Sequence, residues 1–258
     1  MKITLLSTRH GRGLTTVSAL LADMASRKYG IPCMLTHTGA RDDAMDSYMS
    51  LSKGMDKTMN FRQIVKLSEV GEISGSDLKD YTVKRGKLNI FNPNGEEIDD
   101  EKGNMLLMQI LKTNVHGLTF IDVTGELTDP GVESILADSD FHVIVLNQSI
   151  ETINQLKYWK EYGYWEKIEQ TGYIIIINCF NNNIMALDKI VKLIGAKRNR
   201  VFKMHYNPLI VKQANEGTLL ISNEYAMVGD PRYVQLKTDL LECLKAIAAN
   251  LGLAYKWR

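Results

Sequence analysis

The sequence Lys2-Ile-Thr-Leu-Leu-Ser-Thr-Arg-His-Gly-Arg-Gly-Leu-Thr-Thr16 runs from a short apolar segment into a polar loop that contains two glycines. Residues 2–6 are apolar and β-prone, which predicts a buried strand. Behind the loop, apolar residues recur at helical spacing until Gly30, so a helix of about four turns should begin at Gly13 or Leu14. The recurring positions are Val17, Leu20, Leu21, Met24 and Ala25. The order of strand, glycine-containing loop and helix decides the fold.

The same alternation continues along the chain. Further strands are predicted at residues 31–35, 118–122, 141–146 and 173–178. Helices are predicted at residues 105–114, 131–137, 152–162, 184–194 and 233–251. Such alternation is typical of an α/β fold, in which helices cover both faces of a mostly parallel sheet. We expect residues 1–258 to form one three-layer α/β/α domain. Residues 41–103 are an insertion-rich segment of it, with a helix at 60–70 and a strand at 87–92.

Composition limits the classes of partner. The chain has 258 residues, of which 24% are charged, and a formal net charge of +1. With a net charge near zero, the protein as a whole does not attract nucleic acid or an anionic membrane electrostatically. DNA is therefore not an expected partner, despite the local basic cluster Lys197-Arg-Asn-Arg200. No apolar run reaches the roughly 18 residues of a membrane span. We therefore expect a cytoplasmic protein, whose contact with the inner face of the membrane is peripheral if it occurs at all.

Neither cysteine nor histidine spacing predicts a metal site. The three cysteines, Cys33, Cys179 and Cys243, are far apart and lie in apolar surroundings, which predicts reduced thiols in the core. The histidines lack the spacing of metal ligands, so surface or sheet-edge positions are expected for them. They are His10, His37, His116, His142 and His205.

The loop at residues 7–16 has the parts of a phosphate-binding loop with one exception. Such a loop needs glycines that let backbone N–H groups converge on phosphate, a lysine for the β- and γ-phosphates, and a hydroxyl for Mg²⁺. The lysine position holds Leu14, and the leading glycine position holds Thr8. The remaining parts are present as Gly11, Gly13, Thr15 and Thr16. The loop therefore predicts a phosphate site without its central cation.

The stretch Arg9-His-Gly-Arg-Gly-Leu-Thr-Thr16 resembles the deviant phosphate loop of the ParA/MinD family, K-G-G-x-G-K-T-T followed by an amphipathic helix. In that family the first lysine reaches across a nucleotide-sandwich dimer, and here Arg9 has its position and its charge. The second lysine falls on Leu14, which cannot stabilise charge on the γ-phosphate. The resemblance implies an ATP site formed by Arg9, His10, Gly11, Arg12, Gly13, Leu14, Thr15 and Thr16.

Two further landmarks of the family concern metal and catalysis. Asp122 matches the Walker B aspartate, so the resemblance implies Mg²⁺ held by Thr15 and Asp122. The family's Asp-x-Asp pair, which positions the attacking water, falls on Thr36-His-Thr38. Both carboxylates are therefore missing, and no residue is assigned as catalytic.

Two more landmarks concern the nucleotide base. Asn178 matches the strand-end asparagine that holds adenine in the family, and Pro208 begins a segment similar to the family's proline, helix and Ala-x-x-Gly. The resemblance implies that both residues bind nucleotide. The residues alone also allow a second interpretation, in which Asn178 and Asp122 cap strand ends and Arg9 and Arg12 are solvated charges.

Within the family, the chain most resembles the TadZ/CpaE group, pilus-assembly and polar-localisation relatives of MinD with atypical phosphate loops. The resemblance rests on the blocks Asp77-Leu-Lys-Asp-Tyr81, Leu88-Asn-Ile-Phe91, Leu136-Ala-Asp-Ser-Asp140 and Ile150-Glu-Thr-Ile-Asn154. It implies a homodimer that works with a protein partner in a larger assembly, such as a pilus or secretion machine.

Three functions are compatible with these residues. The first is a localisation or assembly factor that binds ATP and Mg²⁺ weakly, dimerises and hydrolyses ATP slowly or not at all. The second is a slow partition-type ATPase, as in plasmid or chromosome segregation, in which Arg9 or Arg12 replaces the missing lysine. The third is an interaction module without nucleotide, in which Leu14 and His37 fill the former pocket.

Overall fold

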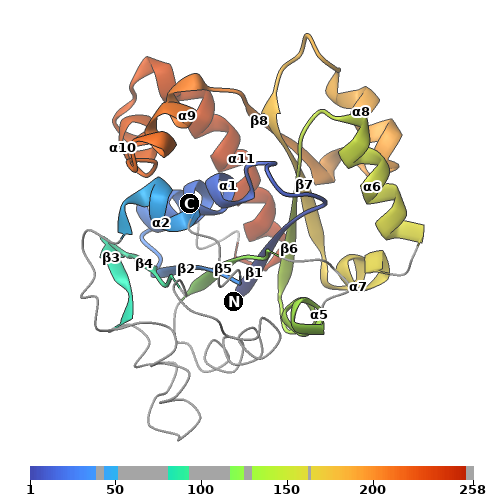
Figure 1. Ribbon diagram of the computed structural model, residues 1–258, viewed down its shortest axis with the longest axis horizontal. Coiled ribbons are helices and arrows are strands. Elements are labelled where there is room, and N and C mark those ends of the chain that lie inside the picture. Colours follow the sequence, from blue (N-terminus) through green and yellow to red (C-terminus); the bar gives the residue numbers. More distant parts are fainter. Residues whose placement is uncertain (39–43, 52–80, 93–116, 125–129, 162–163, 254–258) are drawn as a thin grey trace, which may run out of the picture.

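A computed structural model describes residues 1–38, 44–51, 81–92, 117–124, 130–161 and 164–253. Within them lies one eight-stranded sheet with the order β3-β4-β2-β5-β1-β6-β7-β8 (Figure 1). Neighbouring strands are parallel, except that β3 and β4 form an antiparallel pair. The strands are β1 (Lys2–Ser7), β2 (Cys33–His37), β3 (Val83–Arg85), β4 (Leu88–Ile90), β5 (Leu118–Asp122), β6 (Phe141–Leu146), β7 (Tyr173–Phe180) and β8 (Val201–His205). The predicted mostly parallel α/β fold is confirmed.

Helices cover both faces of this sheet (Figure 1). One face packs against α1 (Leu14–Tyr29), α2 (Ala44–Met49), α9 (Pro208–Asn215), α10 (Ile221–Val228) and α11 (Val234–Asn250). The other packs against α5 (Pro130–Ala137), α6 (Ile150–Glu161), α7 (Tyr164–Thr171) and α8 (Leu187–Ile194). Two short 3₁₀ helices, η3 (Arg198–Arg200) and η4 (Pro231–Tyr233), precede β8 and α11.

β1 shows why its sequence is apolar throughout. The strand pairs with β5 on one side and β6 on the other, so it lies in the middle of the sheet. Leu5 belongs to the core cluster beneath α1 and α11, and Leu6 belongs to the cluster beneath α5 to α8. A strand whose two faces are both covered cannot alternate apolar with polar residues.

Most predicted elements lie where the sequence indicates, with shifted ends. β2 begins at Cys33 and not at residue 31, because Pro32 has no N–H to donate to the ladder. β8, α7 and α10 were not predicted from periodicity. β8 is an edge strand with half-buried Phe202 and Lys203, so it lacks the continuous apolar run of the inner strands. The predicted helices at 60–70 and 105–114, and most of residues 41–103, lie outside the described residues.

Two expectations about titratable residues are wrong. His37 and His142 are not at the surface but buried on inner strands, where His37 Nε2 contacts Asn92 Oδ1 at 2.6 Å and His142 Nδ1 contacts Thr4 Oγ1 at 2.6 Å. Cys33 and Cys243 are buried thiols as expected, but Cys179 is exposed. The backbone at Cys179 has φ 52°, within a register irregularity between Ile177 and Phe180, which accounts for its departure from the inward-facing pattern of β7.

Burial of His142 makes stability depend on pH. Desolvation lowers its pKa from an ordinary 6.5 to about 4, so the folded state resists protonation more than the unfolded chain does. The neutral imidazole is compatible with the fold above pH 6.5, and stability should fall as the pH drops toward 4. The loss should approach about 3 kcal/mol. Urea unfolding of wild type and His142→Gln at pH 7, 5 and 4 gives the free energy of unfolding at each pH. The free energy should fall more steeply with decreasing pH in the wild type than in His142→Gln. Equal pH dependence in the two proteins would contradict this assignment.

Candidate functional site

The loop between β1 and α1 turns on two glycines. Gly11 and Gly13 have φ angles of 73° and 78°, in the left-handed region that other residues rarely adopt. Gly13 is the N-cap of α1, and its carbonyl accepts the first helical hydrogen bond from Val17 N at 2.9 Å. Ser7 Oγ donates to the carbonyl of Arg9 at 2.9 Å and steadies the start of the loop. The amino end of a four-turn helix therefore follows directly, with backbone N–H groups available to an anion.

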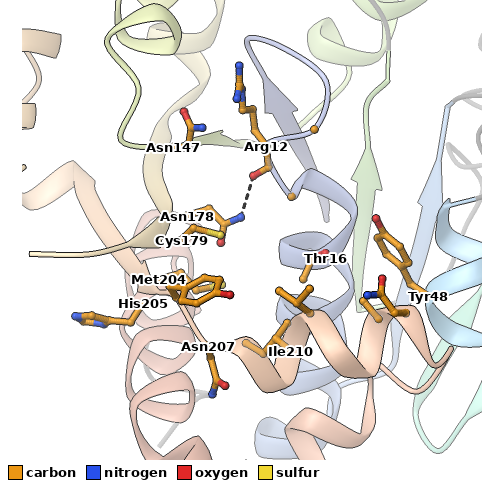
Figure 2. Close-up of a pocket in the computed structure, with 16 residues that line it drawn as sticks. Arg12, Thr16, Tyr48, Asn147, Asn178, Cys179, Met204, His205, Asn207 and Ile210 are labelled. Atoms are coloured by element: carbon orange, nitrogen blue, oxygen red, sulfur yellow. Dashed lines mark hydrogen bonds between the residues drawn. The ribbon is translucent and has the colours of Figure 1, made fainter. Parts of the chain in front are cut away.

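Asn178 ties the end of β7 to this loop. Its Nδ2 donates to the carbonyl of Arg12 at 2.8 Å, and its side chain is largely buried (Figure 2). A Cβ atom at Gly13 would lie 2.2 Å from Nδ2, so only glycine leaves room for the amide. Gly13 is therefore required both by its backbone conformation and by the close approach of Asn178.

A pocket of about 240 Å³ opens beside the loop (Figure 2). The loop contributes Gly11, Arg12, Gly13 and Thr16 to its wall. Residues at or just after the carboxyl ends of β6, β7 and β8 form another part, and α9 completes it. This is the edge of an open parallel sheet where ligands bind. Further lining residues are Tyr48, Asn147, Asn178, Cys179, Tyr206, Asn207 and Ile210.

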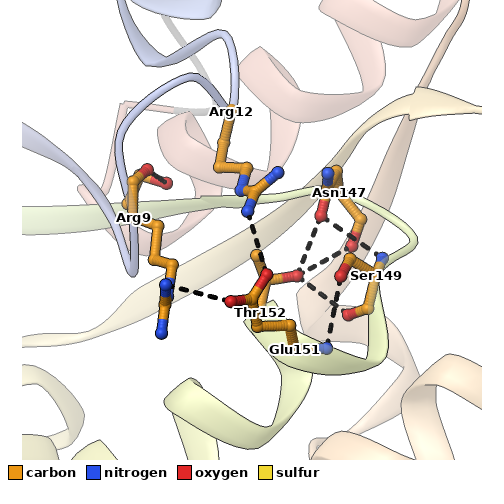
Figure 3. A network of polar contacts seen from close by, with 7 residues as sticks. Arg9, Arg12, Asn147, Ser149, Glu151 and Thr152 are labelled. Carbon is orange, nitrogen blue, oxygen red and sulfur yellow. Dashed lines mark hydrogen bonds and ion pairs between the residues drawn. The ribbon is translucent and has the colours of Figure 1, made fainter.

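Both arginines of the loop contact one carboxylate on α6 (Figure 3). Arg9 Nη1 lies 2.9 Å from Glu151 Oε1, and Arg12 Nη2 lies 3.4 Å from Glu151 Oε2. The side chains of Arg9 and Glu151 are about half exposed. Glu151 was not singled out from the sequence, because nothing in the sequence indicates that a residue 139 positions after Arg12 reaches it.

Threonine hydroxyls lie at the end of β2, where the family resemblance of the sequence implies a carboxylate pair. Thr38 Oγ1 donates to the carbonyl of Thr124 at 3.0 Å and accepts from Thr124 N at 2.9 Å. Thr36 is buried in β2. The hydroxyl of Thr38 thus fastens the end of β2 to the segment after β5, and neither residue has a carboxylate that could activate water.

The oxygen donors expected for Mg²⁺ are Asp122, at the carboxyl end of β5, and Thr15, in the helix that follows the loop after β1. Asp122 is fully buried at the end of β5, next to β1, and Thr15 is buried in the first turn of α1. A carboxylate and a hydroxyl are ligands that Mg²⁺ accepts, usually together with phosphate oxygens and water. The donor chemistry of these two residues fits the ion.

Comparison with known proteins identifies the fold. No protein-family model matches the chain, and no curated protein matches its sequence. A chain of the MinC:MinD cell division protein complex from Aquifex aeolicus matches the structure with a TM-score of 0.71 and 18% identity, over 96% of this chain and 95% of its own. A ParA family ATPase from Chlorobium tepidum TLS matches with a TM-score of 0.69 and 19% identity, over 95% and 97%. This chain has the MinD/ParA fold.

A third similar structure contains a nucleotide. The septum site-determining protein MinD from Pyrococcus horikoshii OT3, complexed with Mg-ADP, has a TM-score of 0.67 and 14% identity over 95% of this chain and 98% of its own. The likeness to all three structures concerns the fold. Within the described ranges, the chain has no helix long and apolar enough to cross a membrane.

The MinD/ParA fold of this chain brings only part of the predicted residues to the pocket. Gly11, Arg12, Gly13, Thr16 and Asn178 line it together. Leu14 is partly buried and packs against the core cluster of α1 and α11. Pro208 is exposed at the first position of α9, next to the N-cap Asn207, which does line the pocket. The predicted residues outside the lining are Arg9, His10, Leu14, Thr15, Pro208 and Asp122.

The double requirement at Gly13 can be measured. Gly11→Ala should cost about 1–2 kcal/mol, because φ is positive but open space surrounds the added methyl group. Gly13→Ala should cost about 1 kcal/mol more, because the methyl group displaces Asn178 and breaks its bond to Arg12. Urea unfolding of the two variants gives the comparison. In an Asn178→Ala background the extra cost should disappear, and its persistence would refute the contact.

Proposed function

We propose that this chain binds ATP in the pocket beside the loop and acts as a nucleotide-dependent localisation or assembly factor with little or no hydrolysis. One observation carries the proposal: the pocket opens onto the glycine-containing turn at the amino end of α1. Backbone N–H groups and the helix dipole attract phosphate there even without a lysine. Phosphates would lie on residues 11–16, and the base and ribose would occupy the pocket toward α9.

The orientation of Asn178 supports adenine as the base. Because Nδ2 is engaged by the carbonyl of Arg12, the amide oxygen Oδ1 remains for the ligand. An oxygen acceptor suits the amino group of adenine, whereas guanine presents a carbonyl oxygen at the corresponding edge. Two acceptors facing each other would leave both without a hydrogen bond.

Mg²⁺ would be held by Thr15 and Asp122 and would neutralise part of the triphosphate charge. The chain's own residues contribute little to hydrolysis. Leu14 packs into the core and brings no charge to the γ-phosphate, and the hydroxyl of Thr38 is engaged by Thr124. These features support retention of binding and loss of turnover.

The alternatives are less well supported. In the interaction-module hypothesis, Leu14 and His37 fill the pocket, but neither residue lines it, and a volume of about 240 Å³ remains. In the slow partition-type hypothesis, Arg9 or Arg12 replaces the lysine, but Thr36 and Thr38 still provide no carboxylate that could activate water. An unchanged turnover rate in Arg12→Ala would remove this second hypothesis.

The MinD/ParA fold and the resemblance to the TadZ/CpaE group extend the proposal to an assembly role. A homodimer would bring the half-exposed Arg9 of each copy to the other's nucleotide. The dimer would then position a protein partner in a pilus or secretion apparatus at the inner face of the membrane.

Base recognition gives the first test. In calorimetry with Mg²⁺, ATP should bind at least about tenfold more tightly than GTP, because only adenine satisfies Asn178 Oδ1. Asn178→Ala should remove most of this preference. Loss of its hydrogen bond to Arg12 would weaken the binding of both nucleotides, whereas loss of the base contact would change the ratio of the ATP and GTP affinities. Asn183→Ala, at an exposed asparagine that does not line the pocket, is the control. Equal binding of ATP and GTP by the wild type would contradict the assignment of Asn178.

Dimer lifetime gives the second test. With ATP and Mg²⁺ the chain should form a dimer that persists for hours, because slow hydrolysis does not remove the nucleotide that links the copies. Light scattering and phosphate release, recorded on the same sample, measure size and turnover together. Arg9→Ala should bind ATP but remain monomeric. Turnover at the rate of active MinD proteins, abolished by Asp122→Ala, would show that the chain is an ATPase.

A further inference from the structure

The two arginines of the phosphate loop are engaged by the protein itself. Arg9 and Arg12 contact the two different oxygens of the Glu151 carboxylate (Figure 3). We propose that Glu151 is an internal counter-ion that holds both arginines toward α6 and that a triphosphate must displace to use them. Glu151 would thereby set the affinity of the loop for nucleotide. This inference rests on the proposed nucleotide binding.

Glu151 is fixed at its backbone. It lies in the first turn of α6, where a negative charge is favourable, and its N–H donates to Ser149 Oγ at 3.2 Å. The side chain of Thr152 donates to Asn147 Oδ1 at 2.9 Å and closes the same turn (Figure 3). Since the backbone of Glu151 is anchored at the start of a helix, exchange of partners requires only rotation of the glutamate and arginine side chains.

The arrangement leaves the arginines incompletely satisfied. The Arg12 contact is the longer one, at 3.4 Å, and Arg12 Nε is buried with no hydrogen-bond partner among the described residues. Arg12 also extends away from the pocket, from the point where its carbonyl meets Asn178 (Figure 2). A single carboxylate has two oxygens for two guanidinium groups, whereas a triphosphate offers many more acceptors. The ion pairs are therefore suited to displacement by nucleotide.

The absence of lysine makes this competition important. With Leu14 at the lysine position, Arg9 and Arg12 are the permanently charged cationic side chains of residues 7–16. Any side-chain charge that this loop offers to phosphate must first leave Glu151. Exposed ion pairs are weak, so removal of the carboxylate charge should tighten nucleotide binding about three- to tenfold.

The test compares Glu151→Gln with Glu133→Gln in the full chain. Glu133 is also an exposed carboxylate that pairs with a cation, Lys167, but it lies on α5 away from the loop. Calorimetry with ATP and Mg²⁺ at low salt should show that Glu151→Gln binds about three- to tenfold more tightly than the wild type. Glu133→Gln should bind with the affinity of the wild type. The gain should vanish near 1 M salt and in an Arg9→Ala/Arg12→Ala background. Unchanged or weaker binding by Glu151→Gln would overturn the proposal.

A second measurement separates this inference from the proposed function. Phenylglyoxal modifies accessible arginines, and mass spectrometry reports the reaction at each site without any nucleotide. Arg9 and Arg12 should react faster in Glu151→Gln than in wild type or Glu133→Gln. Unchanged reactivity would overturn the counter-ion role even if ATP binds. Faster reactivity without ATP binding in any variant would instead refute the proposed nucleotide function, and with it the role of Glu151 in affinity.

Discussion

The left-handed backbone at Gly13 is the constraint on which the site depends. It ends the loop, starts α1 and leaves the space into which the amide of Asn178 fits against the carbonyl of Arg12. One residue without a side chain therefore couples β1, α1 and β7, which are distant in sequence. The pocket and the amino end of the helix are adjacent because these three elements meet at that point.

The apolar runs allowed much of the fold to be predicted from sequence. Residues 118–122 and 141–146 are inner strands whose two faces are covered, so their composition alone marks them. β8 was missed because an edge strand mixes Lys203 with apolar residues. In the candidate site, local patterns and the family resemblance predicted the loop and Asn178, and both line the pocket. Glu151 was not predicted, because its role arises only when α6 lies beside the loop, and one sequence does not report such a tertiary contact.

In the candidate site, the backbone and the side chains have separate roles. Backbone N–H groups and the amino end of a helix attract an anion whatever the side chains are, so this attraction does not depend on a lysine at position 14. The side chains of two residues near the loop make contacts within the protein. Leu14 contributes to the core, and Thr38 fastens two segments of backbone. Under the proposed function, the chain would bind ATP as a structural ligand and would hydrolyse little of it.

The irregular end of β7 gives the chain a built-in attachment point for a reporter group. Cys33 and Cys243 are buried, and burial raises the pKa of both thiols, that of Cys33 to about 12, so reagents in water scarcely reach them. Partial burial raises the pKa of Cys179 as well, but Cys179 is the exposed thiol of the three and stands in the wall of the pocket. A maleimide dye would therefore attach at one defined position in the unaltered sequence, where its fluorescence would respond to whatever enters the cavity.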